Sequence, residues 1–261
     1  MTTGICLIAC IPLRSEPDHK SEMVSQLLFG ESFDILGTQN GWLHIEMHYD
    51  HYRGWISGSQ AHIFEAPTRD ISSTTPSLVT ADNLGSMTDT ITRIKFPVSA
   101  GSTFLPGEDH KMVVGGHRYC YHGNLAAGNK QKTCEQISAY ARSLLHTPYL
   151  WGGRSAFGID CSGFVQVVFK MAGIWLPRDS RDQAKEGESI HLIHETKPGD
   201  LLFFDNKEGE INHVGLMLNE GELIHAHGKV RIDRIDHHGI FNADQKAYTH
   251  KLRLMKRICA E

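Results

Sequence analysis

The stretch GIDCSGFVQVVF, residues 158–169, predicts a cysteine at the first turn of an apolar helix. Its apolar residues repeat at the i, i+4 spacing of one helix face. Asp160 stands at the expected N-cap position, and Gly173 suits the C-terminal end of the helix. Unpaired N–H groups and the positive end of the helix dipole favour an anion there. We therefore expect a lowered pKa for Cys161 and a nucleophilic thiolate.

Two histidine-containing stretches supply a base for this cysteine, without which a buried structural role would be the better interpretation. His213 opens one apolar stretch, and His225 lies in the next, beyond the turn Asn219-Glu220-Gly221. In such a hairpin the two histidines would lie close to opposite each other, near enough for a hydrogen bond. His227 shares the face of His225 and competes with it. A cysteine, a base and a residue that orients the base are the parts of a cysteine hydrolase.

The composition is that of an ordinary globular protein. The chain has 261 residues, 40% of them hydrophobic and 21% charged, which suits one large domain or two to three small ones. A net charge of -4 gives no signature of polyanion binding, so nucleic acid is not expected. The 17 histidines are scattered and the six cysteines form no CxxC pair, so neither a metal site nor a cofactor is expected.

The N-terminal run, residues 1–13, is interpreted as a β-strand and not as a signal peptide. The run is short, no basic residues precede it, and no cleavage-site pattern follows it. No stretch approaches the length of a membrane-spanning helix. Without an export signal we expect reduced thiols and a cytoplasmic location.

Residues 1–65 predict a first small β-barrel. Short runs of β-branched and aromatic residues are separated by turn residues, and Asn40-Gly41 is the clearest hairpin signal. Four motifs stand out: Ile11-Pro12-Leu13-Arg14, Leu28-Phe29-Gly30-Glu31, Gly41-Trp42 and Tyr52-Arg53-Gly54-Trp55-Ile56. With these motifs the region resembles a bacterial SH3-like domain, a module that usually binds peptides or cell-wall fragments.

Two further regions follow the first barrel. Residues 66–127 are interpreted as a linker, polar over about 66–80, and a second, more diverged SH3-like barrel. Strands of that barrel are expected at 90–94, 96–98, 101–105 and 111–121. In residues 128–261, helices near Cys134 and Cys161 are followed by strands, which predicts an α+β domain.

Five motifs follow one another in this last region: Tyr149-Leu150-Trp151-Gly152-Gly153, Asp160-Cys161-Ser162-Gly163-Phe164-Val165-Gln166, Pro198-Gly199-Asp200-Leu201-Leu202-Phe203-Phe204, His213-Val214-Gly215 and Ile224-His225-Ala226. In this order they resemble the NlpC/P60 family of papain-like cysteine peptidases. The resemblance implies Cys161 as nucleophile, His213 as base and His225, rather than His227, as the residue that orients the base. It also gives Tyr149 an assisting role, and the N–H of Cys161 is a reasonable oxyanion donor.

The resemblance implies hydrolysis of bacterial cell-wall peptides, usually at the bond between γ-D-glutamate and a diamino acid. The whole arrangement is similar to the γ-D-glutamyl-L-diamino acid endopeptidases, including the dipeptidyl-peptidase VI type. Those enzymes release L-Ala-γ-D-Glu from free murein peptides and require a free N-terminal alanine. The substrate-binding residues that this implies are Glu31, Tyr52 and Asp160 near the ammonium group, Arg178 and Ser180 at the D-Glu α-carboxylate, and Ser162 beside the nucleophile.

Three other functions fit the sequence less well. An exported endopeptidase acting on intact peptidoglycan is disfavoured by the missing export signal. A non-catalytic binder of cell-wall fragments would require a lost catalytic residue, and a histidine-rich metalloprotein lacks ligand spacing. We therefore expect a cytoplasmic peptidase of murein peptides, L-Ala-γ-D-Glu-diamino acid, with no nucleic-acid or membrane partner. Which diamino acid follows D-Glu is left open.

Overall fold

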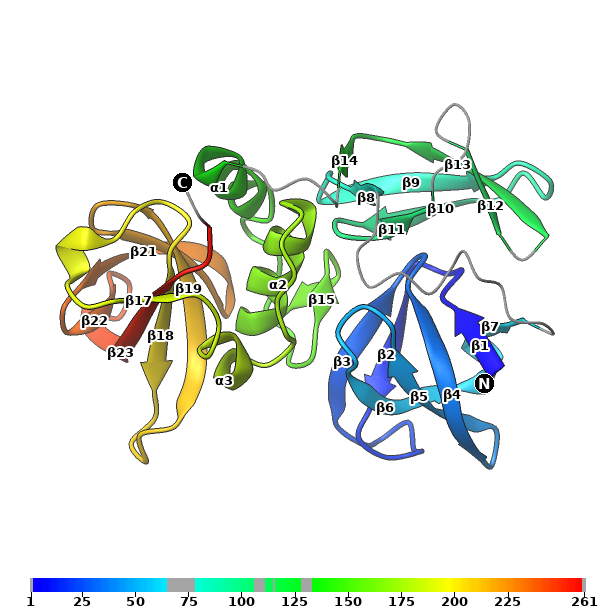
Figure 1. Cartoon of the computed structure of the whole chain (residues 1–261), viewed down its shortest axis with the longest axis horizontal. Helices are drawn as coiled ribbons and strands as arrows, with labels where there is room; N and C mark the ends of the chain where they lie inside the picture. The colour runs from blue at the N-terminus through cyan, green and yellow to red at the C-terminus, as the bar shows by residue number, and fades with distance from the viewer. Residues whose placement is uncertain (1, 65–77, 106–110, 115, 128–132, 260–261) are drawn as a thin grey trace.

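The computed structural model describes residues 2–64, 78–105, 111–114, 116–127 and 133–259. Two β-rich parts precede a C-terminal part in which helices pack on a large sheet, so the fold class is α+β (Figure 1). Residues 66–77 of the expected linker lie outside the described residues, and residues 78–80 form a strand. The domain boundaries at 65/66 and 127/128 stay predictions.

The first barrel is one antiparallel sheet in the order β3-β2-β6-β5-β4-β1-β7. The hairpin at Asn40-Gly41 joins β4 to β5, and both of its residues have positive φ (48° and 82°), as a tight hairpin turn requires. The N-terminal run forms two strands, where one was expected. The elements are β1 (Thr2–Ile5), β2 (Cys10–Arg14), β3 (Met23–Leu28), β4 (Ser32–Gln39), β5 (Trp42–Met47), β6 (Arg53–Ser57), η1 (Gly58–Gln60) and β7 (His62–Ile63).

The second barrel consists of a sheet β10-β9-β13-β12 and a smaller sheet β11-β8-β14. The strand expected at 90–94 is instead the turn between β9 and β10. Its cause is Asp89, whose carboxylate accepts the N–H groups of Ile91 and Thr92 and so bends the chain. The strands are β8 (Leu78–Thr80), β9 (Leu84–Asp89), β10 (Lys95–Ser99), β11 (Thr103–Phe104), β12 (Lys111–Val114), β13 (His117–His122) and β14 (Leu125–Ala127).

The C-terminal part is built on the sheet β17-β23-β18-β19-β20-β21-β22. The long strand β23 pairs with β18 along one part and with β22 along another, so β18 to β23 close on themselves. The elements are α1 (Cys134–Ser143), β15 (Arg154–Ser155), β16 (Gly158–Ile159), α2 (Cys161–Met171), α3 (Ser180–Gln183), β17 (Glu188–Ile190), η3 (Ile193–Glu195), β18 (Leu201–Asp205), β19 (Ile211–Asn219), β20 (Glu222–His227), β21 (Lys229–Asp236), β22 (Gly239–Asn242) and β23 (Ala247–Arg257).

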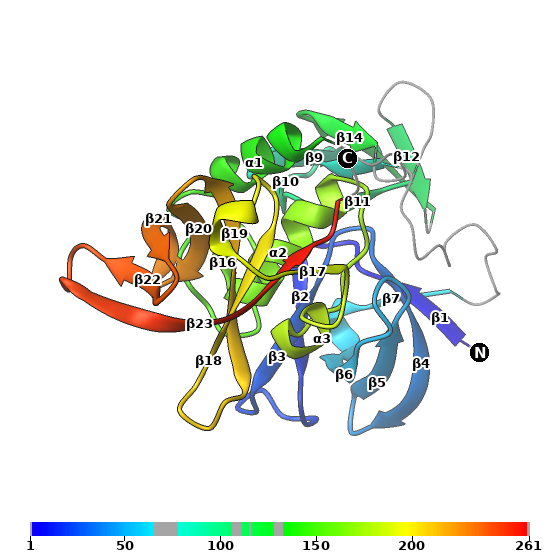
Figure 2. The same ribbon diagram turned by 60° about the vertical axis from the view of Figure 1, so that its left-hand side comes forward.

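Helix α2 lies in the middle of the molecule, between the C-terminal sheet and the two barrels (Figures 1 and 2). Each of its residues is buried. One apolar cluster contains α2 together with Leu28 of the first barrel and Val79 and Ala100 of the second. Full burial of each large apolar side chain stabilises the fold by about 1.5–3 kcal/mol. The three parts of the chain therefore share a core around this helix.

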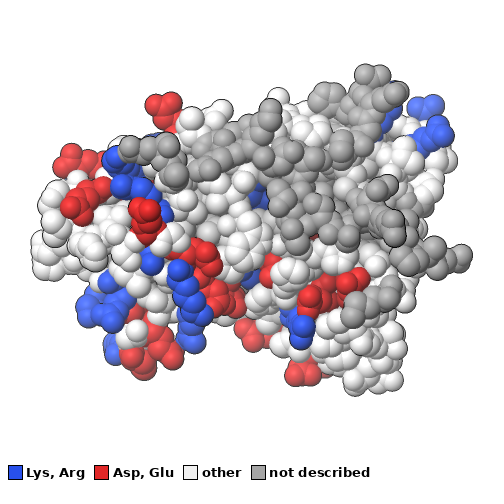
Figure 3. All heavy atoms as spheres, in the orientation of Figure 1, with Lys and Arg blue, Asp and Glu red and all other residues white. Residues whose placement is uncertain are grey.

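The surface carries both signs of charge. On the face drawn in Figure 3, acidic and basic side chains of the described residues are interspersed. Within the described ranges, none of the helices has the length and the apolar character that a membrane crossing needs.

Candidate active site

A cavity of about 880 Å³ opens where the first barrel meets the C-terminal part, a size common for ligand sites. The first barrel contributes Glu22, Val24 and Tyr52 to its wall. The C-terminal part contributes the remaining lining residues: Tyr149, Trp151, Asp160, Cys161, Ser162, Arg178, Asp179, Ser180, Arg181, Asp182, Lys185, Ile211, Asn212, His213, Ala226, His227, Gly228 and His250.

Cys161 is the first residue of α2, as the sequence predicts, and Asp160 is the N-cap residue. The Asp160 carboxylate accepts the Gly163 N–H at 2.7 Å. The expected fall in the pKa of Cys161 is wrong. Burial raises the pKa to about 12 and the neighbouring Asp160 adds to the rise, while the N–H groups of Val214 and Ser162 lower it by less. At pH 7 Cys161 is therefore a neutral thiol.

His213 and His225 lie against each other, and His213 shares the cavity wall with Cys161. His213 Nε2 and His225 Nδ1 are 2.8 Å apart. His225 is fully buried and its Nε2 lies 3.0 Å from the carboxylate of Asp233. Desolvation, together with the other histidines, holds the pKa of His213 well below its usual value, so the imidazole is neutral at pH 7. A neutral imidazole next to a thiol can accept the thiol proton.

The two histidines are diagonal neighbours on adjacent strands, close to opposite each other and within hydrogen-bond reach, as the sequence predicts. The register pairs His225 with Gly215, two residues beyond His213, and a bulge interrupts the pairing between Met217 and Asn219. Diagonal cross-strand side chains still lie within reach of each other. The His227 ring is farther from His213, with centroids 6.5 Å apart against 5.1 Å for His225.

Tyr149 lies in the cavity wall with Cys161. Its pKa is raised, first by burial and then by the nearby Cys161 and Asp160. The phenol is therefore a neutral donor at pH 7, as an assisting role beside the reacting group requires.

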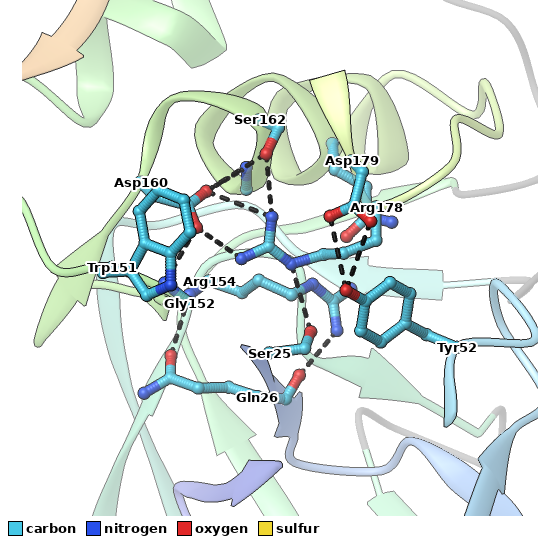
Figure 4. A network of polar contacts seen from close by, with 12 residues as sticks. Ser25, Gln26, Tyr52, Trp151, Gly152, Arg154, Asp160, Ser162, Arg178 and Asp179 are labelled. Atoms are coloured by element: carbon cyan, nitrogen blue, oxygen red, sulfur yellow. Dashed lines mark hydrogen bonds and ion pairs between the residues drawn. The ribbon is translucent and has the colours of Figure 1, made fainter. Parts of the chain in front are cut away.

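Arg178, Asp160 and Ser162 form one buried network (Figure 4). The two Arg178 Nη groups donate to both Asp160 oxygens at 3.1 and 2.5 Å, and Nη1 also donates to Ser162 Oγ at 2.9 Å. Arg178 Nε donates to Ser25 of the first barrel. The Arg178 guanidinium was expected to bind a substrate carboxylate. In the structure it binds protein side chains instead, and Arg178 is only 2% exposed. Ser180 lies in the cavity wall at the start of α3.

The structure does not bring Glu31 to the cavity. Its carboxylate is 3% exposed and accepts from both Arg154 Nη groups at 3.0 Å and from Lys170 Nζ at 2.6 Å. These cations outweigh desolvation and lower the pKa of Glu31 to about 2. Two buried cations hold the carboxylate in place, so the expected contact between Glu31 and a substrate ammonium group is wrong for this arrangement.

Among the acids of the cavity wall, Asp179 and Glu22 each bond to an aromatic side chain. Tyr52, from the first barrel, donates its hydroxyl to Asp179 at 3.2 Å (Figure 4). Glu22 accepts the indole N–H of Trp151 at 2.6 Å. Burial raises the pKa of Asp179. The cation and the hydrogen bond near this carboxylate therefore do not fully compensate for its loss of solvent.

Comparison with known proteins matches two segments of the chain to family models. Residues 146–250 match the model of the NlpC/P60 family, a segment that contains Cys161, His213 and His225. The chain carries an NlpC/P60 domain. Residues 13–60, ahead of the NlpC/P60 domain, match the model described as a bacterial dipeptidyl-peptidase SH3 domain, which identifies the first barrel as SH3-like.

Several known proteins are similar to this chain. The gamma-D-glutamyl-L-lysine dipeptidyl-peptidase of Bacillus subtilis (strain 168) is 44% identical over 117 residues, which cover 44% of this chain and about two fifths (39%) of that one. The dipeptidyl-peptidase 6 of Lysinibacillus sphaericus is 28% identical over 89% of this chain and 92% of that one. A solved structure of an NlpC/P60 family protein from Bacillus cereus ATCC 10987 shares the fold, with a TM-score of 0.82, 98% of this chain and 99% of that chain covered, and 17% identity.

Reasoning from the sequence missed several polar residues around the NlpC/P60 site, among them Glu22, Asp179 and Asp233. Asp179 could have been found, because it stands between Arg178 and Ser180 in a motif already singled out. Glu22 and Asp233 lie in no motif, and only the packing of β3 and β21 brings them to the site.

Proposed function

We propose that this chain is a cysteine peptidase that hydrolyses the γ-D-glutamyl–diamino acid bond of free murein peptides and releases L-Ala-γ-D-Glu. The observation that carries the proposal is that one cavity is lined both by Cys161 and His213 and by the acids Glu22 and Asp179. The names of the relatives from B. subtilis and L. sphaericus support the peptidase class and the peptide substrate.

The chemistry follows from the placement of Cys161 and His213. The thiol proton passes to His213 as Sγ forms a bond to the γ-carbonyl carbon, and the carbonyl π pair moves to oxygen. The N–H of Cys161, at the start of α2, is a donor for that oxyanion. When the C–N bond breaks, His213 returns the proton to the leaving amine. Water, deprotonated by His213, then cleaves the thioester and regenerates the thiol.

Substrate length is set, in this proposal, by the first barrel. A peptide that begins with a free ammonium group would pair it with Asp179, and Tyr52 would orient that carboxylate by its hydrogen bond. Glu22, beside Trp151, adds a second negative charge to the same wall. Asp160 is already matched by Arg178, so its part is to hold Arg178 and cap α2. Ser162 is already bonded to Arg178 and Asp160, so the hydroxyl of Ser180, in the cavity wall, remains as the contact for the D-Glu carboxylate.

Mass spectrometry of the products tests this function. L-Ala-γ-D-Glu-meso-diaminopimelate and its L-lysine counterpart are incubated with the protein beside intact sacculi. Release of L-Ala-γ-D-Glu from the free peptides alone is the expected result. Cleavage of sacculi would favour an exported endopeptidase, and binding without cleavage would favour a non-catalytic binder. A cytoplasmic location belongs to this proposal and is tested by fractionating cells.

A further inference from the structure

We propose that Asp233 is a positioning residue that extends the catalytic triad to a relay of four, by fixing which nitrogen of His213 faces the Cys161 thiol. The inference deepens the proposed function and rests on it for its meaning in catalysis. The contacts that carry it belong to the folded protein whatever its substrate is.

Asp233 and His225 are joined by a hydrogen bond. Asp233 lies on β21, next to the strand of His225, and is 6% exposed. Its hydrogen bonds from His225 and Arg231 lower its pKa, so it is ionised at pH 7 and can only accept a proton. At 3.0 Å from Asp233 Oδ2, His225 Nε2 must therefore be the donor.

Because His225 donates to Asp233, the position of the proton on His213 is fixed as well. Burial lowers the pKa of His225, so its ring is neutral and carries one N–H, which is used at Nε2. His225 Nδ1 is then an acceptor, and the 2.8 Å contact requires His213 to donate from its Nε2. His213 is neutral too, so its Nδ1 keeps the lone pair. That nitrogen is the one left to accept the thiol proton of Cys161.

Arg231 holds the carboxylate of Asp233 in place. Arg231 lies directly opposite His225 in the register and donates to Asp233 Oδ1 at 2.8 Å. The Arg231 Nε also lies 2.7 Å from Asp233 Oδ2. On its outer side, Arg231 donates to Asp244 at 2.9 Å. The carboxylate is thus clamped between a cation and His225, as a residue that sets a tautomer needs to be.

Without the carboxylate the two rings could invert. His225 Nδ1–H would then donate to His213 Nε2, and His213 would present an N–H to the thiol, which cannot take up a proton. Loss of an aspartate that holds a catalytic histidine in its tautomer costs up to about 10⁴ in kcat when the contact is direct. Here one ring intervenes, and we expect Asp233→Asn to lower kcat by about 10² with little change in KM.

The pH profile gives a readout that a merely structural residue would not move. Among the described residues, the charged or titratable groups around the two rings are Cys161 on α2, His227 on β20, His250 on β23, and Asp233 and Arg231 on β21. Removing the negative charge of Asp233 makes protonation of the rings harder. The acid limb of kcat/KM should therefore move to lower pH in Asp233→Asn. Asp236→Asn, on the same strand and bonded to Tyr248, is the matched control and should leave the limb in place.

The decisive measurement uses the unmodified protein. Nitrogen-15 NMR of labelled histidines distinguishes an N–H from a bare nitrogen at each ring position. We expect His213 and His225 both to carry their proton on Nε2. A proton on Nδ1 of either ring, or unchanged tautomers, kcat and pH profile in Asp233→Asn, would overturn the relay. Correct tautomers with no peptidase activity would instead count against the proposed function alone.

Discussion

Burial and hydrogen bonding act in opposite directions on the pKa of Cys161, and burial has the larger effect. The residue is still placed where its sulfur shares a cavity with His213. We predict that Cys161→Ala abolishes hydrolysis of L-Ala-γ-D-Glu-diaminopimelate while peptide binding, followed by calorimetry, is retained. Cys120→Ala, in the second barrel, is the control and should keep full activity. Turnover by Cys161→Ala would remove Cys161 as the nucleophile.

The pKa of His213 makes a prediction about pH. A base works only when neutral, and desolvation with the surrounding histidines keeps the pKa of His213 well below 6.5. The group therefore stays active as pH falls through 6.5 and is lost only at lower pH. We predict an acid limb of kcat/KM well below pH 6.5, measured by product release over a pH series. A limb near pH 7 would contradict the buried, neutral base.

The sequence predicted individual residues unevenly. Cys161 and His213 stand in motifs, and the motifs place them at the start of α2 and in β19, where the structure has them. Glu31 also stands in a motif, yet the partners that hold it, Arg154 and Lys170, are more than a hundred residues away in the chain. Contacts over such separations have no local periodicity to reveal them. Asp233 was missed for the same reason.

At the scale of the element, the start of α2 depends on one carboxylate. Asp160 caps the helix at Gly163 and also neutralises the buried Arg178. Removing one partner of a buried ion pair costs about 3–5 kcal/mol. We predict a loss of this size in the free energy of unfolding of Asp160→Ala, measured by urea titration. Asp160→Asn should lose less, because its carbonyl still accepts the Gly163 N–H.

An exposed pair gives the matched control. Asp182 and Lys185 lie on the surface at 2.6 Å, and such pairs contribute about 0–1 kcal/mol. Asp182→Asn should therefore leave the free energy of unfolding almost unchanged. Equal losses in Asp160→Ala and Asp182→Asn would show that Arg178 does not need its partner.

Elements with a clear period were predicted well from sequence. Helices α1 and α2 and strands β18 to β21 fall at or near the expected residues. Strands β22 and β23 were missed, because β23 alternates exposed and half-buried residues and gives a weak apolar signal. The turn at 90–94 was predicted as a strand from Ile91 and Ile94, which are exposed apolar residues. In that segment the carboxylate of Asp89 had more influence than β propensity.

For the whole molecule, the buried group of Glu31, Arg154 and Lys170 joins the first barrel to the C-terminal part. Because Glu31→Gln leaves two buried cations without their anion, we predict a loss of about 3–5 kcal/mol in the free energy of unfolding. The pKa of Glu31 is lowered to about 2, so its contribution is full above about pH 4.5 and is lost as pH falls toward 2.

The exposed ion pair of Glu210 and Arg181 provides the control for Glu31→Gln. Glu210→Gln removes an exposed partner of Arg181 and should change the free energy of unfolding by less than about 1 kcal/mol. If Glu31→Gln kept its stability and only raised KM, Glu31 would be a substrate contact after all.

The cavity spans two parts of the chain, and this makes substrate length a property of the whole molecule. Acetylating the N-terminus of the substrate removes the charge that would pair with Asp179. We predict a fall of about 10–100-fold in kcat/KM, since hydrogen bonds to charged groups contribute about 1.5–3 kcal/mol. In Asp179→Asn the two substrates should react at similar rates, whereas Asp18→Asn, on an exposed loop, should discriminate like the unmodified protein. Equal rates for both substrates in the unmodified protein would exclude recognition of the ammonium group.

The contact between Gly30 and Thr103 limits the exchange of domains between related genes. Gly30 has a φ of 77°, and a side chain there would strike the Thr103 backbone, while Thr103 also bonds to Phe29 and Lys170. A chimaera that received a foreign first barrel would need a glycine at position 30 and, next to it, an acid at position 31 to bind Arg154 and Lys170. The barrels and the peptidase can therefore be exchanged between genes only as a matched set, and a recombinant that breaks the set would lose its fold before its specificity.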